Sequence, residues 1–283
     1  NYEKAGKAPL LLSGEQSFNK KGSCEYQDLE YPDDCIVDFD MRLIDLFKEI
    51  DKKKLTLKMQ IRQEYYRVKE LLDGKRPSRM DLFTYMDDEI YRICVSGSHA
   101  KENPFQQYLD FLYELGELSE DEQKLYAGIG REFIQTIETT EMQKVYKMPI
   151  LYSFYNHGNI RLAVTDEEVL ESWKEFFDTG TNWKDFPNVN TYEDYKKVTD
   201  KQHLSKAKRM PIRFLKASGK GFFVEKDGYA LALRDEIGEV VGNMAFGEQM
   251  GDVLGYRSLE YYRRRYEKAD EIGDRKKDIF DFL

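Results

Sequence analysis

The chain has few cysteines, few histidines and no long hydrophobic run. Its three cysteines, Cys24, Cys35 and Cys94, are odd in number and form no Cys-x-x-Cys pair. A disulfide framework and a structural zinc site are therefore not expected, and this cysteine usage favours a reducing, cytoplasmic compartment. No apolar run approaches the length of about 18 residues that a membrane-spanning helix needs, so no membrane partner is expected.

Recognisable catalytic motifs are also missing. The histidines His99, His157 and His203 are scattered beside turn-forming or polar residues and are expected at the surface. Neither His-Glu-x-x-His nor Gly-x-x-x-x-Gly-Lys-Ser/Thr occurs, so a zinc-hydrolase ligand pair and an ATP-binding loop are both lacking. No catalytic residue, metal ligand or cofactor can be assigned, and whether the chain is an enzyme stays open.

The first part of the chain is acidic and irregular. Between Glu25 and Asp40 there are seven acids and no base. Residues 1–40 are interpreted as a linker, or as the end of a missing upstream domain. The chain begins at Asn1 in the middle of a pattern, which suggests a piece of a longer protein. Asp40 is expected to cap a first helix that presents Leu43, Ile44, Phe47 and Ile50 on one face.

Residues 41–143 are predicted to form an all-helical domain. Apolar residues recur at helical spacing over 56–73, Gly74 ends that pattern, and Ser78 with Asp81 caps the next helix. This order is the outline of a helix-turn-helix corner, at which Arg76 and Arg79 are candidates to bind phosphate. The alternative is that two helices merely meet there. Further helices are predicted over 103–115 and 119–139.

Residues 144–250 are predicted to form a winged-helix-like domain with a small β-hairpin wing. The expected order is a helix from Met148 to Asn156, a strand at 160–164, a helix capped by Thr165, further helices broken at Pro211, and a hairpin. Asp227-Gly228 between two apolar runs predicts a two-residue type I′ turn. Residues 251–283 should hold one more helix, near 250–268, and a charged tail. The fold class is therefore mainly α.

A concentration of positive charge lies just before the hairpin. The 25 residues from Lys196 to Lys220 contain nine Lys or Arg and one acid, Asp200, whereas the whole chain has a net charge of −9. Concentrated positive charge beside a two-stranded wing is typical of a surface that holds a nucleic-acid backbone. The alternative is an ordinary solvated helix face. The candidate phosphate contacts in this segment are Lys196, Lys197, Lys206, Lys208, Arg209, Arg213, Lys216 and Lys220.

A second basic run, Arg263-Arg264-Arg265, is flanked by tyrosines at 261, 262 and 266. Tyrosine and arginine together could stack on bases or hold phosphate. The alternative is an amphipathic helix with its tyrosines inward and its arginines in solvent.

Several strings resemble a known family. They are Cys35-Ile36-Val37-Asp38-Phe39-Asp40, the helix around Tyr66-Arg67-Val68-Lys69, Arg76-Pro77-Ser78-Arg79, Pro149 to Gly158, and Pro211-Ile212-Arg213-Phe214. Together they are similar to the C-terminal accessory region of bacterial superfamily II (DEAD/DEAH-box) helicases, of the kind associated with restriction-type DNA translocases.

The resemblance implies a mostly helical, non-catalytic region that grips duplex or single-stranded DNA. Its partners would then be DNA and the motor domains of the same full-length chain. ATP and Mg²⁺ are expected only in those missing motor domains. Two other functions stay open: a protein-interaction module that docks through aromatic-rich helical faces, and a hydrolase whose site is assembled from distant acids.

Overall fold

The computed structural model describes residues 55–271, with side chains described for residues 55–266. The acidic segment 1–40 and the helix expected after Asp40 lie outside the described residues. The described part belongs to one compact unit, Leu55–Leu283. It is mainly helical and includes a small three-stranded antiparallel sheet.

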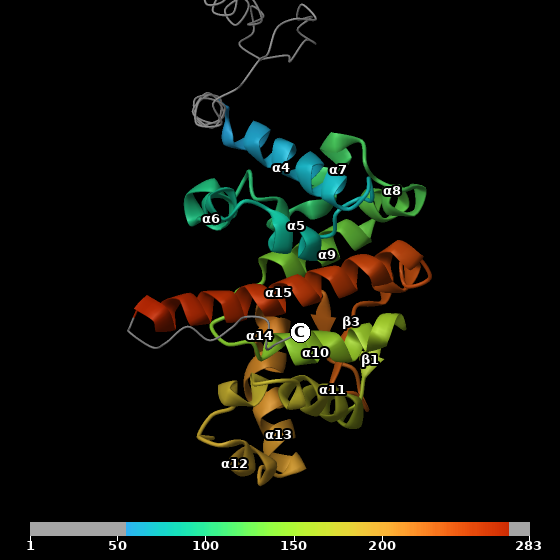
Figure 1. Cartoon of the computed structure of the whole chain (residues 1–283). Coiled ribbons are helices and arrows are strands. Elements are labelled where there is room, and N and C mark those ends of the chain that lie inside the picture. The colour runs from blue at the N-terminus through green and yellow to red at the C-terminus, as the bar shows by residue number, and fades with distance from the viewer. Residues whose placement is uncertain (1–54, 272–283) are drawn as a thin grey trace, which may run out of the picture. The chain divides into compact units, whose positions relative to one another are not determined.

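Helices α4 to α9 form the first half of this unit, on one side of the long helix α15, Met244–Glu271 (Figure 1). Capping residues begin several of them: Thr56 caps α4, and Ser78 with Asp81 forms a capping box on α5. Asp73 and Gly74 both have positive φ after α4, so the chain turns where expected. The helices are α4 Leu57–Leu71, α5 Arg79–Tyr85, α6 Asp88–Val95, α7 Tyr108–Leu115, α8 Glu120–Ala127 and α9 Ile129–Thr139, with short 3-10 turns at Gly97–His99 and Pro104–Gln106.

The second half, on the other side of α15, holds helices α10 to α14 and the sheet (Figure 1). Thr165 and Glu168 form the expected capping box of α11. The helices are α10 Lys147–Tyr155, α11 Asp166–Asp178, α12 Tyr192–Lys196, α13 Asp200–Ala207 and α14 Arg213–Ser218, with 3-10 turns at Asn156–Gly158, Asn182–Asp185 and Asp235–Glu239. A π-helical segment, Lys208–Ile212, joins α13 to α14.

The sheet order is β1-β3-β2, with strands β1 Ala163–Val164, β2 Phe223–Val224 and β3 Leu231–Leu233. Strand β3 is central: Ala232 is opposite Ala163 on one side and opposite Val224 on the other. All three residues of β3 are buried, which is the apolar pattern expected of a strand covered on both faces.

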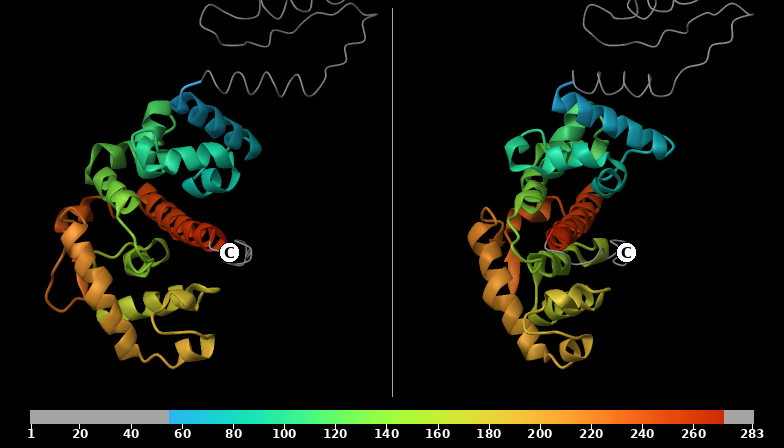
Figure 2. Two further views of the ribbon diagram at one scale, coloured as in Figure 1. Left: turned by 90° about the vertical axis from the view of Figure 1, so that its left-hand side faces the viewer. Right: turned by 60° about the vertical axis from the view of Figure 1, so that its left-hand side comes forward.

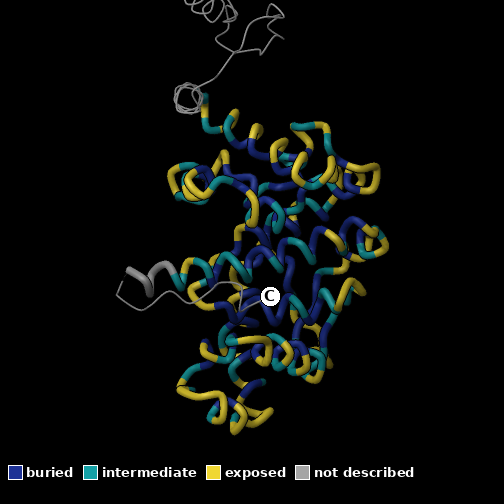
Figure 3. Tube along the Cα trace, in the orientation of Figure 1, coloured by how far each residue is buried: buried dark blue, intermediate teal, exposed yellow. Residues whose placement is uncertain are grey.

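Buried side chains from both halves belong to one hydrophobic cluster, which includes Tyr65, Phe105, Phe133, Trp173 and Phe246. Helix α15 contacts α5, α8 and α9 as well as α10, and buried positions continue along the middle of the molecule (Figure 3). The boundary expected between residues 143 and 144 therefore does not separate two hydrophobic cores.

Four local expectations are wrong. The helix expected over 119–139 is two helices, because Gly128 adopts an extended conformation between α8 and α9. The final helix begins at Met244, so it crosses the boundary expected after residue 250. The hairpin turn is not type I′, since Gly228 has a φ of +83° while Asp227 does not have positive φ. The helix is not broken at Pro211 but continues through the π segment.

Candidate nucleic-acid interface

The continuous helix formed by α13, the π segment and α14 carries most of the basic window. Thr199 and Gln202 form a capping box at its start. His203, Ala207, Ile212 and Leu215 are buried on its inner side. In two views the helix runs along an edge of the molecule, with the loop between β2 and β3 beside it (Figure 2). Its outer face is therefore accessible.

Pro211 explains the π segment. Proline has no N–H to donate, and its ring collides with the carbonyl four residues earlier in a regular α-helix. A π segment has one extra residue in its turn. This extra residue lets the helix continue across Pro211. The extra residue rotates α14 relative to α13, which changes the direction in which Arg213 and Lys216 point. Single π turns of this kind are frequent at functional sites.

Three of the predicted phosphate contacts are exposed and carry positive charge that no neighbour neutralises. Among the residues the structure describes, no carboxylate is within ion-pair distance of Arg209, Arg213 or Lys220. Lys220 follows the end of α14 with a φ of +49°, and Gly221 follows with a φ of +78°. Both residues therefore lie in the tight turn that leads from the helix into β2.

Four other predicted contacts are paired with carboxylates. Lys208 Nζ is 2.6 Å from Asp166, Lys197 Nζ is 3.1 Å from Asp194 and Lys196 Nζ is 3.8 Å from Glu193. Lys216 pairs with Glu225 of the wing loop. Exposed pairs such as these contribute about 0–1 kcal/mol, so a phosphate could replace the carboxylate at small cost. They are nevertheless weaker candidates than the three unpaired residues.

Lys206, on the basic helix, lies near a lysine from an earlier part of the chain, Lys144. Its Nζ is 4.9 Å from the centre of the Tyr146 ring. Burial lowers the pKa of Lys206, and the nearby charges of Arg209 and Lys144 lower it further. The structure thus brings Lys144 close to the basic helix. Lys144 was missed from the sequence because it is 62 residues away from Lys206, and no local sequence pattern links the two residues.

Exposed aromatic rings accompany this surface. Phe214 on α14 is 42% exposed, and Tyr229 in the wing loop is 45% exposed. The Arg213 guanidinium carbon is 5.2 Å from the centre of the Phe214 ring, and Lys226 Nζ is 5.7 Å from that of Tyr229. Rings beside cations can stack on bases while the charges bind the backbone.

The two arginines at the corner near Gly74 do not form a comparable surface. Arg79 is fully buried: its Nη1 is 2.8 Å from both Asp252 and Gln249, and its Nε is 3.0 Å from Glu138. The prediction that Arg79 binds phosphate is wrong, because no part of its side chain reaches solvent. Arg76 is partly exposed, but its Nη2 donates a 2.7 Å hydrogen bond to Glu122.

The arginine run in α15 is also engaged with the protein. Arg263 pairs with Asp88, Arg264 Nε is 3.4 Å from Glu260, and Arg265 pairs with the buried carboxylate of Asp185. The flanking tyrosines at 261 and 262 are buried. This arrangement fits the alternative reading, in which the tyrosines of an amphipathic helix point inward.

Two further features of the described residues bear on other classes of function. Within residues 55–266, no group of three or more His, Cys, Asp or Glu side chains is placed to hold a metal ion. Across the described helices, none is both long enough and apolar enough to cross a membrane. His203, expected at the surface, is buried between the rings of Phe186 and Tyr195.

No protein-family model, no curated protein and no solved structure matches this chain.

Proposed function

We propose that this chain binds nucleic acid, and that it grips the phosphate backbone with the outer face of α13 and α14 and with the adjacent hairpin. The observation that carries the proposal is that Arg209, Arg213 and Lys220 are exposed along one helix and the turn that follows it, with no carboxylate of the described residues within ion-pair distance, in an otherwise acidic protein. Clustered cations without carboxylate partners gain the most from meeting phosphate.

The order of elements supports a winged-helix reading of this half. Helix α10, strand β1, helix α11, the basic helix and the β2-β3 hairpin follow one another, and β1 pairs with β3. In this reading the basic helix occupies the position of a recognition helix and the hairpin is the wing. Helices of this kind enter the major groove of duplex DNA.

The resemblance to helicase accessory regions extends the proposal. In that form the chain is a non-catalytic DNA-binding part of an ATP-dependent helicase or translocase, and acts beside the motor domains of the same protein. Phosphate contacts alone carry no sequence information, so binding without strong base preference is expected.

A second candidate is a protein-interaction module. The observation that favours it is the outer side of α4, where Met59 is 49% exposed and Tyr66 is 44% exposed, with Leu71 59% exposed at the end of the helix. Exposed apolar groups on one helix are typical of a surface that docks a partner. Such a surface could bind a motor domain or another protein.

The proposal is tested by fluorescence anisotropy with labelled duplex and single-stranded DNA at about 50 and 200 mM salt. The site variant is Arg209→Glu/Arg213→Glu/Lys220→Glu. The control, Lys58→Glu/Lys101→Glu/Lys124→Glu, changes the net charge equally at exposed lysines elsewhere.

Wild-type binding should weaken steeply with salt, and the site variant should lose about tenfold or more in affinity while the control loses much less. A smaller salt slope in the site variant would support direct phosphate contacts. Equal loss in both variants would overturn the assignment of this face. No binding at low salt would overturn the proposal and favour the interaction module.

A further inference from the structure

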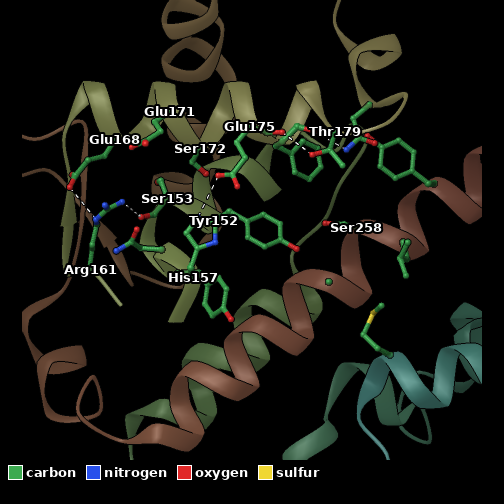
Figure 4. Close-up of a pocket in the computed structure, with 18 residues that line it drawn as sticks. Tyr152, Ser153, His157, Arg161, Glu168, Glu171, Ser172, Glu175, Thr179 and Ser258 are labelled. Carbon is green, nitrogen blue, oxygen red and sulfur yellow. Dashed lines mark hydrogen bonds and ion pairs between the residues drawn. The ribbon is translucent and has the colours of Figure 1, made fainter. Parts of the chain in front are cut away.

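A cavity of about 510 Å³ lies between α10, α11 and α15, away from the outer face of α13 and α14. Figure 4 shows it with α11 along one side and α15 along another, and with residues of α10 and the following turn between them. This volume is within the range of about 300–1,000 Å³ that is usual for small-molecule sites. The proposed nucleic-acid interface makes no use of it.

One part of the cavity wall is aromatic. The Tyr152 ring centre is 6.1 Å from that of Phe176 and 6.2 Å from that of Tyr155, and all three side chains line the space. Burial raises the pKa of Tyr152 to about 12, so its ring is a neutral phenol at neutral pH. Neutral aromatic faces attract cations and apolar groups.

The side formed by α11 is acidic. Glu168, Glu171 and Glu175 recur at spacings of three and four, so their side chains follow the same side of the helix (Figure 4). Arg161 Nε lies 3.1 Å from Glu168 and neutralises it, and His157 Nε2 lies 3.7 Å from Glu175. Among the described residues, no cation is within ion-pair distance of Glu171. The charge that faces the cavity is therefore negative overall.

We propose that this cavity binds a small organic cation, namely an amine carried on an aromatic or similarly apolar body. The rings of Tyr152, Tyr155 and Phe176 would cover the apolar body, and Glu171 with Glu175 would hold the ammonium group. Aromatic faces and carboxylates both favour a cation, so an anion of the same shape is excluded. Nucleic acid, which is an anion, is excluded for the same reason.

Three indole compounds test the charge requirement, because they share a ring and differ in the head group. Tryptamine carries an ammonium, tryptophol a neutral hydroxyl and indole-3-propionate a carboxylate. Isothermal titration calorimetry at neutral pH should give binding of tryptamine that is about tenfold tighter than that of tryptophol, and no binding of indole-3-propionate. Equal affinity for the three compounds, or no tryptamine binding at millimolar concentration, would overturn the proposal.

Two substitutions on α11 localise the site. Glu171→Gln should weaken tryptamine binding about fivefold or more, since it removes an unneutralised charge at the cavity. Glu167→Gln is the matched control, because Glu167 is exposed on the same helix and does not line the cavity. If both substitutions weaken binding equally, the cation is held by the general acidity of the protein and the site is wrong.

Phe176→Leu tests the aromatic wall while it keeps an apolar side chain. It should reduce the preference for tryptamine over tryptophol, and circular dichroism would verify that the variant is folded. An unchanged preference in folded Phe176→Leu would contradict the role of the ring. DNA affinity should be the same in Glu171→Gln and wild type, so this inference and the proposed nucleic-acid function can fail independently.

Discussion

Gly219 at the end of α14 lies directly against the ring of Phe223 in β2. A Cβ atom at position 219 would be 2.3 Å from Phe223 Cδ2 and 2.5 Å from the carbonyl oxygen of Leu215. No side chain fits between the helix and the strand at this point. This contact holds the base of the hairpin against the basic helix, so it fixes how two parts of the proposed interface are placed.

Gly219→Ala should therefore destabilise the fold by about 1–3 kcal/mol, the usual cost of adding a group to a packed site. The backbone carbonyl of Leu215 cannot move aside as a flexible side chain could. Urea denaturation would measure the loss in free energy of unfolding. Gly242→Ala is the control, since a Cβ there has no atom within 4 Å. If both variants are equally stable, Phe223 and the end of α14 can move apart to admit the methyl group at little cost in free energy.

Replacing Glu122 should make the free energy of unfolding depend less on pH in the acidic range. Burial by itself raises the pKa of Glu122, but hydrogen bonds from Arg76, the Ser119 amide and Gln249 lower it below its ordinary value. A lowered pKa gives stability that is present above the ordinary glutamate pKa of about 4.3 and is lost as pH falls through the folded value.

Glu122→Gln should cost on the order of 2 kcal/mol at pH 7, because it weakens hydrogen bonds to a charged group. The difference from wild type should shrink below pH 4. Denaturation curves at several pH values would test this, and a difference that stays constant down to pH 3 would contradict it.

Mild acid should weaken the packing of α13 through His203. Burial lowers the pKa of His203, with a further contribution from Lys174, while Asp200 and Asp178 oppose the shift. The unfolded chain then binds a proton more readily than the folded chain. Stability is complete above the ordinary histidine pKa of about 6.5 and falls as pH drops through the folded value.

His203→Phe, which keeps a ring between Phe186 and Tyr195, should reduce the loss of unfolding free energy between pH 7 and pH 5. His99→Gln, at an exposed histidine, should leave that loss as in wild type. If His203→Phe loses as much unfolding free energy between pH 7 and pH 5 as wild type does, the pH dependence comes from other groups.

The buried Arg79 should be among the most sensitive positions for stability. Arg79→Met leaves Glu138 and the partly buried Asp252 without their cation. Breaking a buried pair in this way costs about 3–5 kcal/mol. Thermal or urea denaturation would measure the effect beside Arg62→Met, which changes an arginine on the exposed side of α4. A cost below about 1 kcal/mol would mean that water reaches these carboxylates.

Helix starts that depend on residues close together in the chain are predicted well from the sequence. The capping boxes at Ser78 and Thr165 begin helices as expected, because each joins residues only three positions apart. The expected break in the helix at Pro211 was wrong for a related reason. The rule for residues before proline describes a local preference, and packing of Pro211 and Ile212 in the core outweighs it by means of the π segment.

The candidate sites depended much less on local sequence. From the sequence, Arg79 and Lys208 are both predicted to be exposed basic residues that bind phosphate. In the fold, Arg79 meets Asp252 across 173 positions and is buried, whereas Lys208 stays exposed beside Asp166. The local sequence around Arg79 or Lys208 does not include Asp252 or Asp166, so it cannot predict either pair. The cavity between α10, α11 and α15 likewise joins segments that are distant along the chain.

The sequence by itself therefore determined the mainly helical class, many helix starts and the concentration of positive charge before the hairpin. These properties follow from composition and from interactions within one turn of helix. Tertiary structure alone decided which charges are neutralised, that Lys144 joins Lys206 and Arg209, and that the acidic side of α11 faces aromatic rings. The physical reason is that electrostatic and packing energies depend on distance in space, which chain folding sets independently of distance along the sequence.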